Sequence, residues 1–220
     1  MTNFSASGFA LVCNALARER IDHLEAFIEP LSSTKPGTRC LLDRQWCQQL
    51  ASEFQMSAEL SGFIPQDFVA IQCTLFEKTT KNNWLVPVHQ DLSVPVAQRQ
   101  ALAGWGTWTQ KEGTTFVQPP VSLLEQLVAV RLHLDDCSAQ DGPLAVVPGS
   151  HRQGIISPEL GVVLRTSEHT CTASVGDALV FKPLLLHRSS KATGTSRRRV
   201  LHLLFGPPTP GDGISWRRAA

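Results

Sequence analysis

The spacing of hydrophobic residues changes about a third of the way along the chain. In residues 10–31, and again in residues 41–60, apolar side chains recur every three or four positions. This period is typical of amphipathic helices. Residues 32–37 separate the two stretches and are rich in residues that favour turns. We therefore predict that residues 1–65 are mostly helical.

From residue 69 onward, apolar residues come in short runs that glycine and proline interrupt. Val69, Ile71, Cys73 and Leu75 fall on one parity of residues 69–77, a pattern that predicts a strand with one buried face. Further strands are predicted at residues 86–91, 127–134, 144–147, 173–175, 178–186 and 199–205. Many short strands indicate a mainly β sandwich or jelly roll, with the N-terminal helices covering one outer face.

The length of the chain sets the expected domain organisation. A chain of 220 residues suits one domain with one sizeable core. We expect a single domain over residues 1–220, with helical support in residues 1–65 and a jelly-roll core in residues 66–205. Residues 206–220 are rich in proline and glycine and should form an irregular tail.

Composition and charge narrow the possible partners. Hydrophobic residues make up 42% of the chain and charged residues 18%, as in ordinary soluble proteins. The net charge of +1 argues against a nucleic-acid-binding face. No apolar run approaches the ~18 residues of a membrane helix, and no secretory signal is visible. The six cysteines are scattered without a paired motif, so we expect reduced thiols and a cytoplasmic location.

His89-Gln90-Asp91 is the first candidate for chemistry. Side chains two residues apart on a strand point the same way, so His89 and Asp91 can reach one metal ion. With a distant His187 they make two histidines and one carboxylate, the facial triad of non-haem Fe(II) oxygenases. His133 and Asp135 have the same spacing, and spacing alone does not choose between the two pairs.

Arg198 is a candidate for binding a carboxylate. It follows His187 by eleven residues, and we expect their strands to be antiparallel neighbours with both side chains on one inner face. A buried arginine needs an anion, yet no acidic residue lies between positions 182 and 211. A carboxylate ligand would serve. The alternative is that Arg197, Arg198 and Arg199 form a solvated charge run. On a strand, Arg197 and Arg199 would point away from Arg198.

Several segments together resemble the phytanoyl-CoA dioxygenase family of Fe(II)- and 2-oxoglutarate-dependent oxygenases. The resemblance runs from about residue 74 to residue 205 and is carried by residues 74–78, 83–91, 131–136, 141–151, 176–179, 185–187 and 198–202. The G-P-L-x-V-x-P-G-S-H block at residues 142–151 is the most specific of these. The resemblance implies a double-stranded β-helix, a cupin-like jelly roll, with iron at its open end and 2-oxoglutarate as cosubstrate.

The resemblance also implies roles for individual residues. His89, Asp91 and His187 match the metal ligands and are the expected catalytic residues. Arg198 matches the residue that binds the far carboxylate of 2-oxoglutarate. The register within residues 197–199 is uncertain by one position.

Two further residues are candidates for the cosubstrate site. Ser189 stands where a hydroxyl commonly assists the arginine, and Arg131 is a weaker candidate on the inner face. Lys78 and Asn83 precede the metal-binding motif, and the sequence does not decide whether they face the pocket.

Other conspicuous residues have ordinary structural interpretations. We expect His151 to make a structural hydrogen bond, His133 to be a core or supporting histidine, and His202 to be a satisfied strand histidine. Trp105 and Trp108 either line the substrate mouth or pack in the interior; the sequence leaves both open.

The expected function follows from the resemblance. The chain should be an Fe(II)- and 2-oxoglutarate-dependent dioxygenase that uses O2 to hydroxylate a small molecule, releasing succinate and CO2. Related halogenases have a small residue in place of the carboxylate, so Asp91 favours hydroxylation. The alternative is a non-catalytic cupin-like sensor of metal and 2-oxoglutarate, or a small-ligand binding protein. Neither the primary substrate nor the oligomeric state can be predicted.

Overall fold

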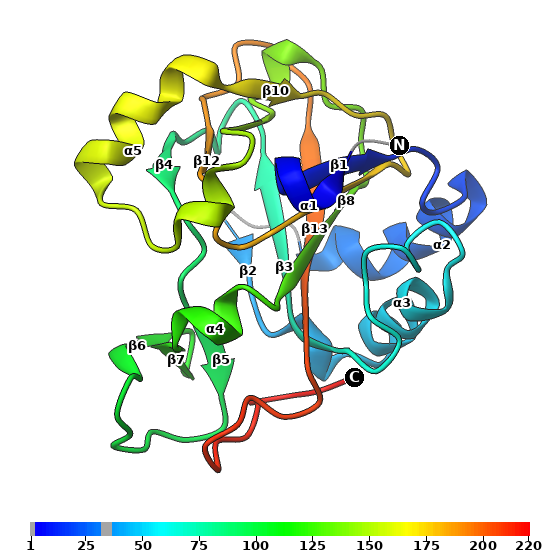
Figure 1. Ribbon diagram of the computed structural model, residues 1–220. Helices are drawn as coiled ribbons and strands as arrows, with labels where there is room; N and C mark the ends of the chain where they lie inside the picture. Colours follow the sequence, from blue (N-terminus) through cyan, green and yellow to red (C-terminus); the bar gives the residue numbers. More distant parts are fainter. Residues whose placement is uncertain (1–2, 32–36) are drawn as a thin grey trace.

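The computed structural model describes residues 3–31 and 37–220 (Figure 1). Its helices are α1 (Phe4–Ser7), α2 (Arg18–Ile28), α3 (Gln45–Met56), α4 (Val121–Leu124) and α5 (Pro158–Leu164). Short 3-10 segments lie at Glu29–Leu31, Leu41–Asp43, Ala139–Asp141, Ser150–Gln153 and Arg165–Ser167. Among the described residues, no helix is long and apolar enough to cross a membrane.

The strands of the described chain form three antiparallel sheets. The six-stranded sheet has the order β1 (Phe9–Val12), β11 (Ala178–Phe181), β8 (Val128–His133), β13 (Arg198–Gly206), β3 (Val69–Lys78) and β2 (Gly37–Thr38). The four-stranded sheet has the order β10 (His169–Cys171), β9 (Leu144–Val146), β12 (His187–Ser189) and β4 (Val86–His89). A smaller sheet contains β5 (Val94–Val96), β7 (Thr114–Gln118) and β6 (Gly106–Lys111). This is the predicted mainly β, jelly-roll architecture.

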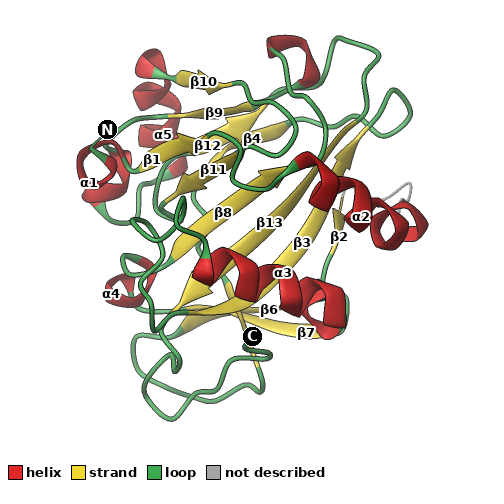
Figure 2. Cartoon of the chain, turned by 90° about the vertical axis from the view of Figure 1, so that its right-hand side faces the viewer, coloured by secondary structure: helices red, strands yellow, loops and turns green. Residues whose placement is uncertain are grey.

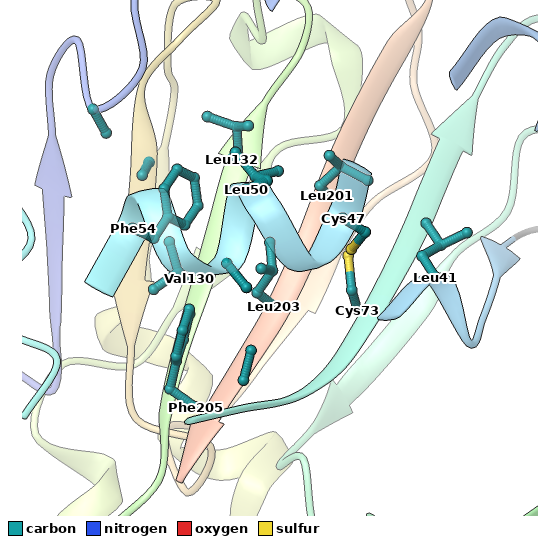
Figure 3. Packing of buried hydrophobic residues seen from close by; sticks show 14 of the residues in the cluster. Leu41, Cys47, Leu50, Phe54, Cys73, Val130, Leu132, Leu201, Leu203 and Phe205 are labelled. Carbon is teal, nitrogen blue, oxygen red and sulfur yellow. The ribbon is translucent and has the colours of Figure 1, made fainter. Parts of the chain in front are cut away.

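Helices α2 and α3 cover the outer face of the six-stranded sheet, as expected for the N-terminal third (Figure 2). Leu50 and Phe54 of α3 point toward Val130 of β8 and Leu203 of β13 (Figure 3). All four side chains are almost completely buried. The apolar side of α3 therefore packs against the outward-facing apolar residues of the strands in one core. This core holds the sheet in place, and the candidate site lies on the other face of the sheet.

The inner face of the same sheet meets the four-stranded sheet. Leu179, Phe181 and Leu204 from the larger sheet pack with Leu144 and Val146 from the smaller one. This second apolar cluster fills the space between the two large sheets near Leu204. Polar residues take over on the same inner face toward the other end, where the cavity described below opens.

The helical prediction for residues 10–31 is wrong in its first part. Residues Phe9–Val12 form strand β1, which pairs with β11 at the edge of the large sheet. Ala10 is buried and Leu11 is exposed, as strand alternation requires. Asn14 adopts a left-handed backbone with φ of 51°, and α2 begins only at Arg18. The local spacing resembled a helix, but pairing with β11 decided the conformation.

The predicted parity of strand β3 also fails at one end. Cys73 and Leu75 pack under the helices, whereas Ile71 belongs to the inner cluster. The pairing with β13 shifts register between Leu204 and Phe205. A β-bulge of this kind inserts one extra residue, so the side chains before it point to the opposite face.

Two predicted strands have different bounds in the structure. The predicted strand 178–186 ends at Phe181, and a turn containing Pro183 leads into β12, which belongs to the other sheet. His187 and Arg198 are therefore not on neighbouring strands. Residues 173–175 form only one isolated bridge, between Ala173 and Cys137, and the strand lies earlier, at β10.

The C-terminal segment after β13 contains no helix or strand of the described chain. After β13, it makes one isolated bridge from Trp216 to Val96 of the small sheet. The division of the chain into support, core and tail stays a prediction.

Candidate metal and cosubstrate site

Three potential metal ligands come together where the two large sheets open. His89 ends β4 and lies opposite His187, the first residue of β12. The ligand atoms of His89, Asp91 and His187 all lie within 4.8 Å of one another. The carboxylate of Asp91 is 3.7 Å from Nε2 of His89 and 3.6 Å from Nε2 of His187. The structure thus brings together the three residues expected to bind a metal.

Backbone carbonyls fix the orientation of both histidine rings. Nδ1 of His89 lies 2.8 Å from the carbonyl of Pro87, and Nδ1 of His187 lies 2.8 Å from the carbonyl of Leu185. A carbonyl can only accept, so Nδ1 carries the proton in each ring and Nε2 presents a lone pair. This arrangement is usual for histidines that bind metal. The donor set therefore fits a divalent iron ion.

The protonation states suit metal binding as well. Burial lowers the pKa of His187 to about 4, even though Asp91 opposes the shift, so the ring is neutral at pH 7. Enclosure tends to raise the pKa of Asp91, but attraction to His187 and the neighbouring histidines keeps it below its usual value. A neutral imidazole and an ionised carboxylate are the forms that coordinate metals.

Gln90 stabilises the segment between the two ligands. Its amide nitrogen donates to the carbonyls of Gly154 and Leu184, and its amide oxygen accepts from the backbone of Ile156. The backbone N–H of Asp91 donates to the carbonyl of Pro183 at 2.9 Å. These bonds hold the motif against the chain that leads into β12, and they explain a buried polar residue between two ligands.

The rival pair, His133 and Asp135, is not assembled into such a site. Asp135 forms an ion pair with Arg199 at 2.6 Å, on the helix side of the sheet. His133 is buried on the inner face, where burial followed by the charge of Arg131 lowers its pKa to about 3. It is a core histidine, in line with its expected structural role.

Lys78, Arg131 and Arg198 are buried on the inner face of the large sheet, with exposed fractions of 1%, 7% and 2%. Within the described residues, none of them has a carboxylate within ion-pairing distance, and the Nε atoms of both arginines are buried without a hydrogen-bond partner. Lys78 lies directly opposite Arg198 in the pairing of β3 with β13. Like charges in such a pair are destabilising. This cluster is suited to an anionic ligand.

Ser189 and Gly142 link the cations. The hydroxyl of Ser189 donates to the carbonyl of Gly142 at 2.8 Å and accepts from Nζ of Lys78 at 2.6 Å. Arg198 donates to the same carbonyl. Gly142 has φ of 63°, and a Cβ there would lie 2.4 Å from the carbonyl of Ser190, so only glycine fits. Burial, then the charges of Arg198 and Arg131, lower the pKa of Lys78 to about 7.

The flanking arginines face the other way, and the run is not a solvated one. Arg199 is paired with Glu25 and Asp135, and Arg197 with Glu29 and Glu77. Because side chains alternate along the strand, Arg197 and Arg199 face carboxylates on one side of the sheet, and Arg198 faces the other side. Among the described residues, Arg198 has no carboxylate partner there.

A cavity of about 350 Å³ joins the metal triad to the cations. Its charged lining residues are Arg39, Lys111, Arg131 and Arg198 against a single carboxylate, Asp91. The lining is thus strongly electropositive, although the whole chain is nearly neutral.

Aromatic side chains supply much of the rest of the cavity wall. Phe76, Trp84 and Phe116 line it. Trp105 does not: it is buried and donates from Nε1 to Asp212. Trp108 packs beside the guanidinium of Arg99, outside the lining. The structure therefore favours the packing interpretation of both tryptophans.

Sequence reasoning misassigned His202. It was expected to be a satisfied strand histidine, but its Nδ1 is buried without a hydrogen-bond partner, and its Nε2 is 3.8 Å from Asp91. The residue lines the cavity opposite Arg131 on β8. Its shared parity with Arg198 on the predicted strand was the available signal. His151, in contrast, contacts the carbonyl of Ser5 at 3.2 Å, as expected of a structural histidine.

Several solved structures are similar to this chain. HygX from Streptomyces hygroscopicus with iron bound is 17% identical, with a TM-score of 0.66, and the match covers 93% of this chain and 84% of HygX. HygX has also been crystallised with nickel, 2-oxoglutarate and hygromycin B bound. AviO1 from Streptomyces viridochromogenes Tue57 is 20% identical, with a TM-score of 0.64 and coverage of 93% and 92%.

A third similar structure is that of an epimerase. SnoN, an α-ketoglutarate-dependent epimerase of nogalamycin biosynthesis, is 15% identical, with a TM-score of 0.66 and coverage of 94% and 79%. At these identities the likeness establishes the fold alone.

Sequence comparison identifies the family. No curated protein matches the chain. The family model for phytanoyl-CoA dioxygenase, however, matches residues 4–200, which is most of the chain and includes the triad and Arg198. The resemblance seen in the motifs is therefore confirmed, and the expected cofactors, Fe(II) and 2-oxoglutarate, agree with the donor set described above. The chain belongs to the phytanoyl-CoA dioxygenase family.

Proposed function

We propose that this protein is an Fe(II)- and 2-oxoglutarate-dependent dioxygenase that hydroxylates a small molecule and releases succinate and CO2. One observation carries the proposal: a single cavity contains both a His–Asp–His triad and buried cations that lack a carboxylate partner among the described residues. A metal ion and a dianionic cosubstrate together account for both features. Membership of the family supports the same conclusion.

The triad has the role of holding the metal by one face. His89, Asp91 and His187 would bind it through two Nε2 atoms and one carboxylate, and a facial set of three leaves other positions for substrates. The bound iron supplies Lewis acidity and the activation of O2. The carbonyls behind the two rings prevent them from turning or changing tautomer.

The cations have the role of binding the cosubstrate. Arg198 is assigned to the far carboxylate of 2-oxoglutarate, with Ser189 beside it. Arg131, on the neighbouring strand, is a weaker candidate for the same ligand. In an enclosed site, where water screens little, an unpaired guanidinium interacts strongly with a carboxylate. Lys78 shares the hydroxyl of Ser189 and adds positive charge when protonated.

The cavity and the carboxylate ligand support the choice of reaction and substrate size. Pockets for small molecules typically measure about 300–1,000 Å³, and this one has about 350 Å³ for cosubstrate and substrate together. Asp91 occupies the ligand position that halogenases leave open, which favours hydroxylation. The fold also carries an epimerase, so the reaction outcome is part of the proposal and does not follow from the fold. A cytoplasmic location is proposed with it.

Metal reconstitution tests the proposal. The protein is loaded anaerobically with Fe(II) and 2-oxoglutarate, the absorbance of the complex is recorded, and succinate is measured after O2 and ascorbate are added. Wild type should show the absorbance band and slow succinate release without a primary substrate. His89→Ala and Asp91→Ala should lose both, whereas His23→Ala, on an exposed helix position, should lose neither.

The outcomes separate the two functional classes. If the complex with Fe(II) and 2-oxoglutarate shows its absorbance band but no succinate is released, the protein is better explained as a non-catalytic sensor. If wild type gave neither signal, or if the two ligand variants behaved like wild type, the proposal would be wrong.

A further inference from the structure

Lys111 is a cation of the cavity that the metal and cosubstrate site does not use. It ends strand β6 and lines the cavity, with Nζ 3.1 Å from the hydroxyl of Ser93 and 4.7 Å from the ring centre of Phe116. No carboxylate of the described chain lies within ion-pairing distance of it. Its contacts hold the ammonium group in place without neutralising it.

The neighbouring Arg39 shows the opposite arrangement. Its guanidinium pairs with Glu112 at 2.7 Å, and its backbone N–H donates to the same carboxylate. Glu112 and Gly113 form the two-residue turn between β6 and β7, both with positive φ, as in a type I′ hairpin. The turn thus directs Glu112 to Arg39 and leaves Lys111 without an acidic partner.

Lys111 belongs to a different part of the fold from the proposed cosubstrate cations. Lys78, Arg131 and Arg198 lie on the six-stranded sheet, whereas Lys111 comes from the small three-stranded sheet. Burial and the charge of Arg39 lower the pKa of Lys111, and Asp91 raises it. Lys111 lines the same cavity as His89, Asp91 and His187.

The charge of the loaded site would still be positive at this position. Under the proposed function, the metal and the two arginines outweigh Asp91 and the cosubstrate dianion by one positive charge. Lys111 adds a second. Lys111 is half-buried, so water screens its charge only in part, and a nearby anion would stabilise it. A neutral or cationic substrate would supply no such anion.

We propose that Lys111 binds an anionic group of the primary substrate, so that the substrate is a small organic acid with an apolar body. The inference rests on the proposed function and names the substrate class for the same site. The ammonium group and the hydroxyl of Ser93 contact the carboxylate, while Phe116 and Trp84 contact the apolar part. This geometry holds the acid by one end and directs the remainder of the molecule toward His89, Asp91 and His187.

Matched acids and amides test the proposal. Protein loaded with Ni(II) and 2-oxoglutarate, which blocks the arginine site without turnover, is titrated with benzoate, phenylacetate, hexanoate and octanoate and with their primary amides. Binding is measured by thermal shift and calorimetry. At least one acid should bind about tenfold or more tightly than its amide. Lys111→Met should remove that preference, and Lys81→Met, at an exposed position, should keep it.

Each other outcome counts against the proposal. Equal binding of acid and amide, an unchanged preference in Lys111→Met, or no binding by any acid would overturn it. Affinity for 2-oxoglutarate should be the same in Lys111→Met and wild type. If wild type binds neither Ni(II) nor 2-oxoglutarate, the proposed function fails separately, and the acid–amide comparison on unloaded protein still tests Lys111.

Discussion

Arg198 and Arg199 are consecutive residues of one strand, both nearly fully buried, yet they lie in opposite surroundings. Arg199, on the helix side, is paired with Glu25 and Asp135. Arg198, on the cavity side, has no carboxylate partner among the described residues and donates to a backbone carbonyl. Burying either charge is unfavourable without an anion. The chain provides that anion on one face of the sheet, and a ligand is expected to provide it on the other.

Replacement of Arg198 should have the largest effect on ligand binding. Arg198→Met should raise the Kd for 2-oxoglutarate about 30-fold or more, because truncating one member of a buried charge pair costs about 2–5 kcal/mol. The melting temperature of the unloaded protein should stay the same or rise, since an unpaired buried charge is removed. Calorimetry with Ni(II)-loaded protein measures the first effect. Arg197→Met is the control, and a comparable loss in that variant would show that the strand register has been misassigned.

Replacement of Arg199 should affect stability instead. Arg199→Met leaves Glu25 and Asp135 without their partner, and the free energy of unfolding should fall by about 3 kcal/mol. The Kd for 2-oxoglutarate should change less than twofold. Urea unfolding and calorimetry on the same preparation check both values. If Arg199→Met folds but no longer binds 2-oxoglutarate, the assignment of Arg199 to stability and of Arg198 to ligand binding is wrong.

Lys78 should make the unloaded protein more stable as the pH rises from 7 to 9. Its pKa is about 7 in the folded chain and near 10.5 when unfolded, so the unfolded chain binds more protons between these values. The unfolding free energy of wild type should therefore rise relative to Lys78→Met, by about 2 kcal/mol between pH 7 and pH 9. Urea unfolding at both pH values measures this difference. If the unfolding free energies of wild type and Lys78→Met change by the same amount between pH 7 and pH 9, the pKa of Lys78 is not lowered in the folded chain.

Ser189 should give the smallest effect. Ser189→Ala removes a hydroxyl that bonds Lys78 and the carbonyl of Gly142. A hydrogen bond of this kind contributes about 1 kcal/mol, so the Kd for 2-oxoglutarate should rise about fivefold. Ser61→Ala, at an exposed position, serves as the control in the same titration. If Ser189→Ala raises the Kd for 2-oxoglutarate as much as Arg198→Met does, the hydroxyl of Ser189 and not Arg198 makes the main contact with the carboxylate.

The metal triad and the strand alternation could be predicted because both depend on local rules. His89 and Asp91 are two residues apart, and the parity of residues 197–199 separates Arg198 from its neighbours. The family motifs then connected this segment with His187, which local spacing could not do. His89 and His187 lie on β4 and β12, which are paired in the four-stranded sheet, and this pairing joins segments that are far apart in the sequence.

Other features depend on contacts between distant segments and were not predictable. The change of face at Ile71 results from a bulge that only the pairing with β13 reveals. Lys78 could not be assigned to the interior because long charged side chains are usually exposed. Residues 106–111, which end at Lys111, contain only one apolar side chain, Trp108, so they lack the alternation of apolar and polar residues that predicts a strand.

The hairpin of β6 and β7 has a consequence for how the wall of the cavity could change. With β5 it forms the small sheet at one end of the molecule, and a tight Glu112–Gly113 turn joins its two strands (Figure 1). His89 and His187 lie on strands of the four-stranded sheet. Substitutions at Lys111 or Phe116 would therefore change the cavity wall without changing the strands that carry His89 and His187.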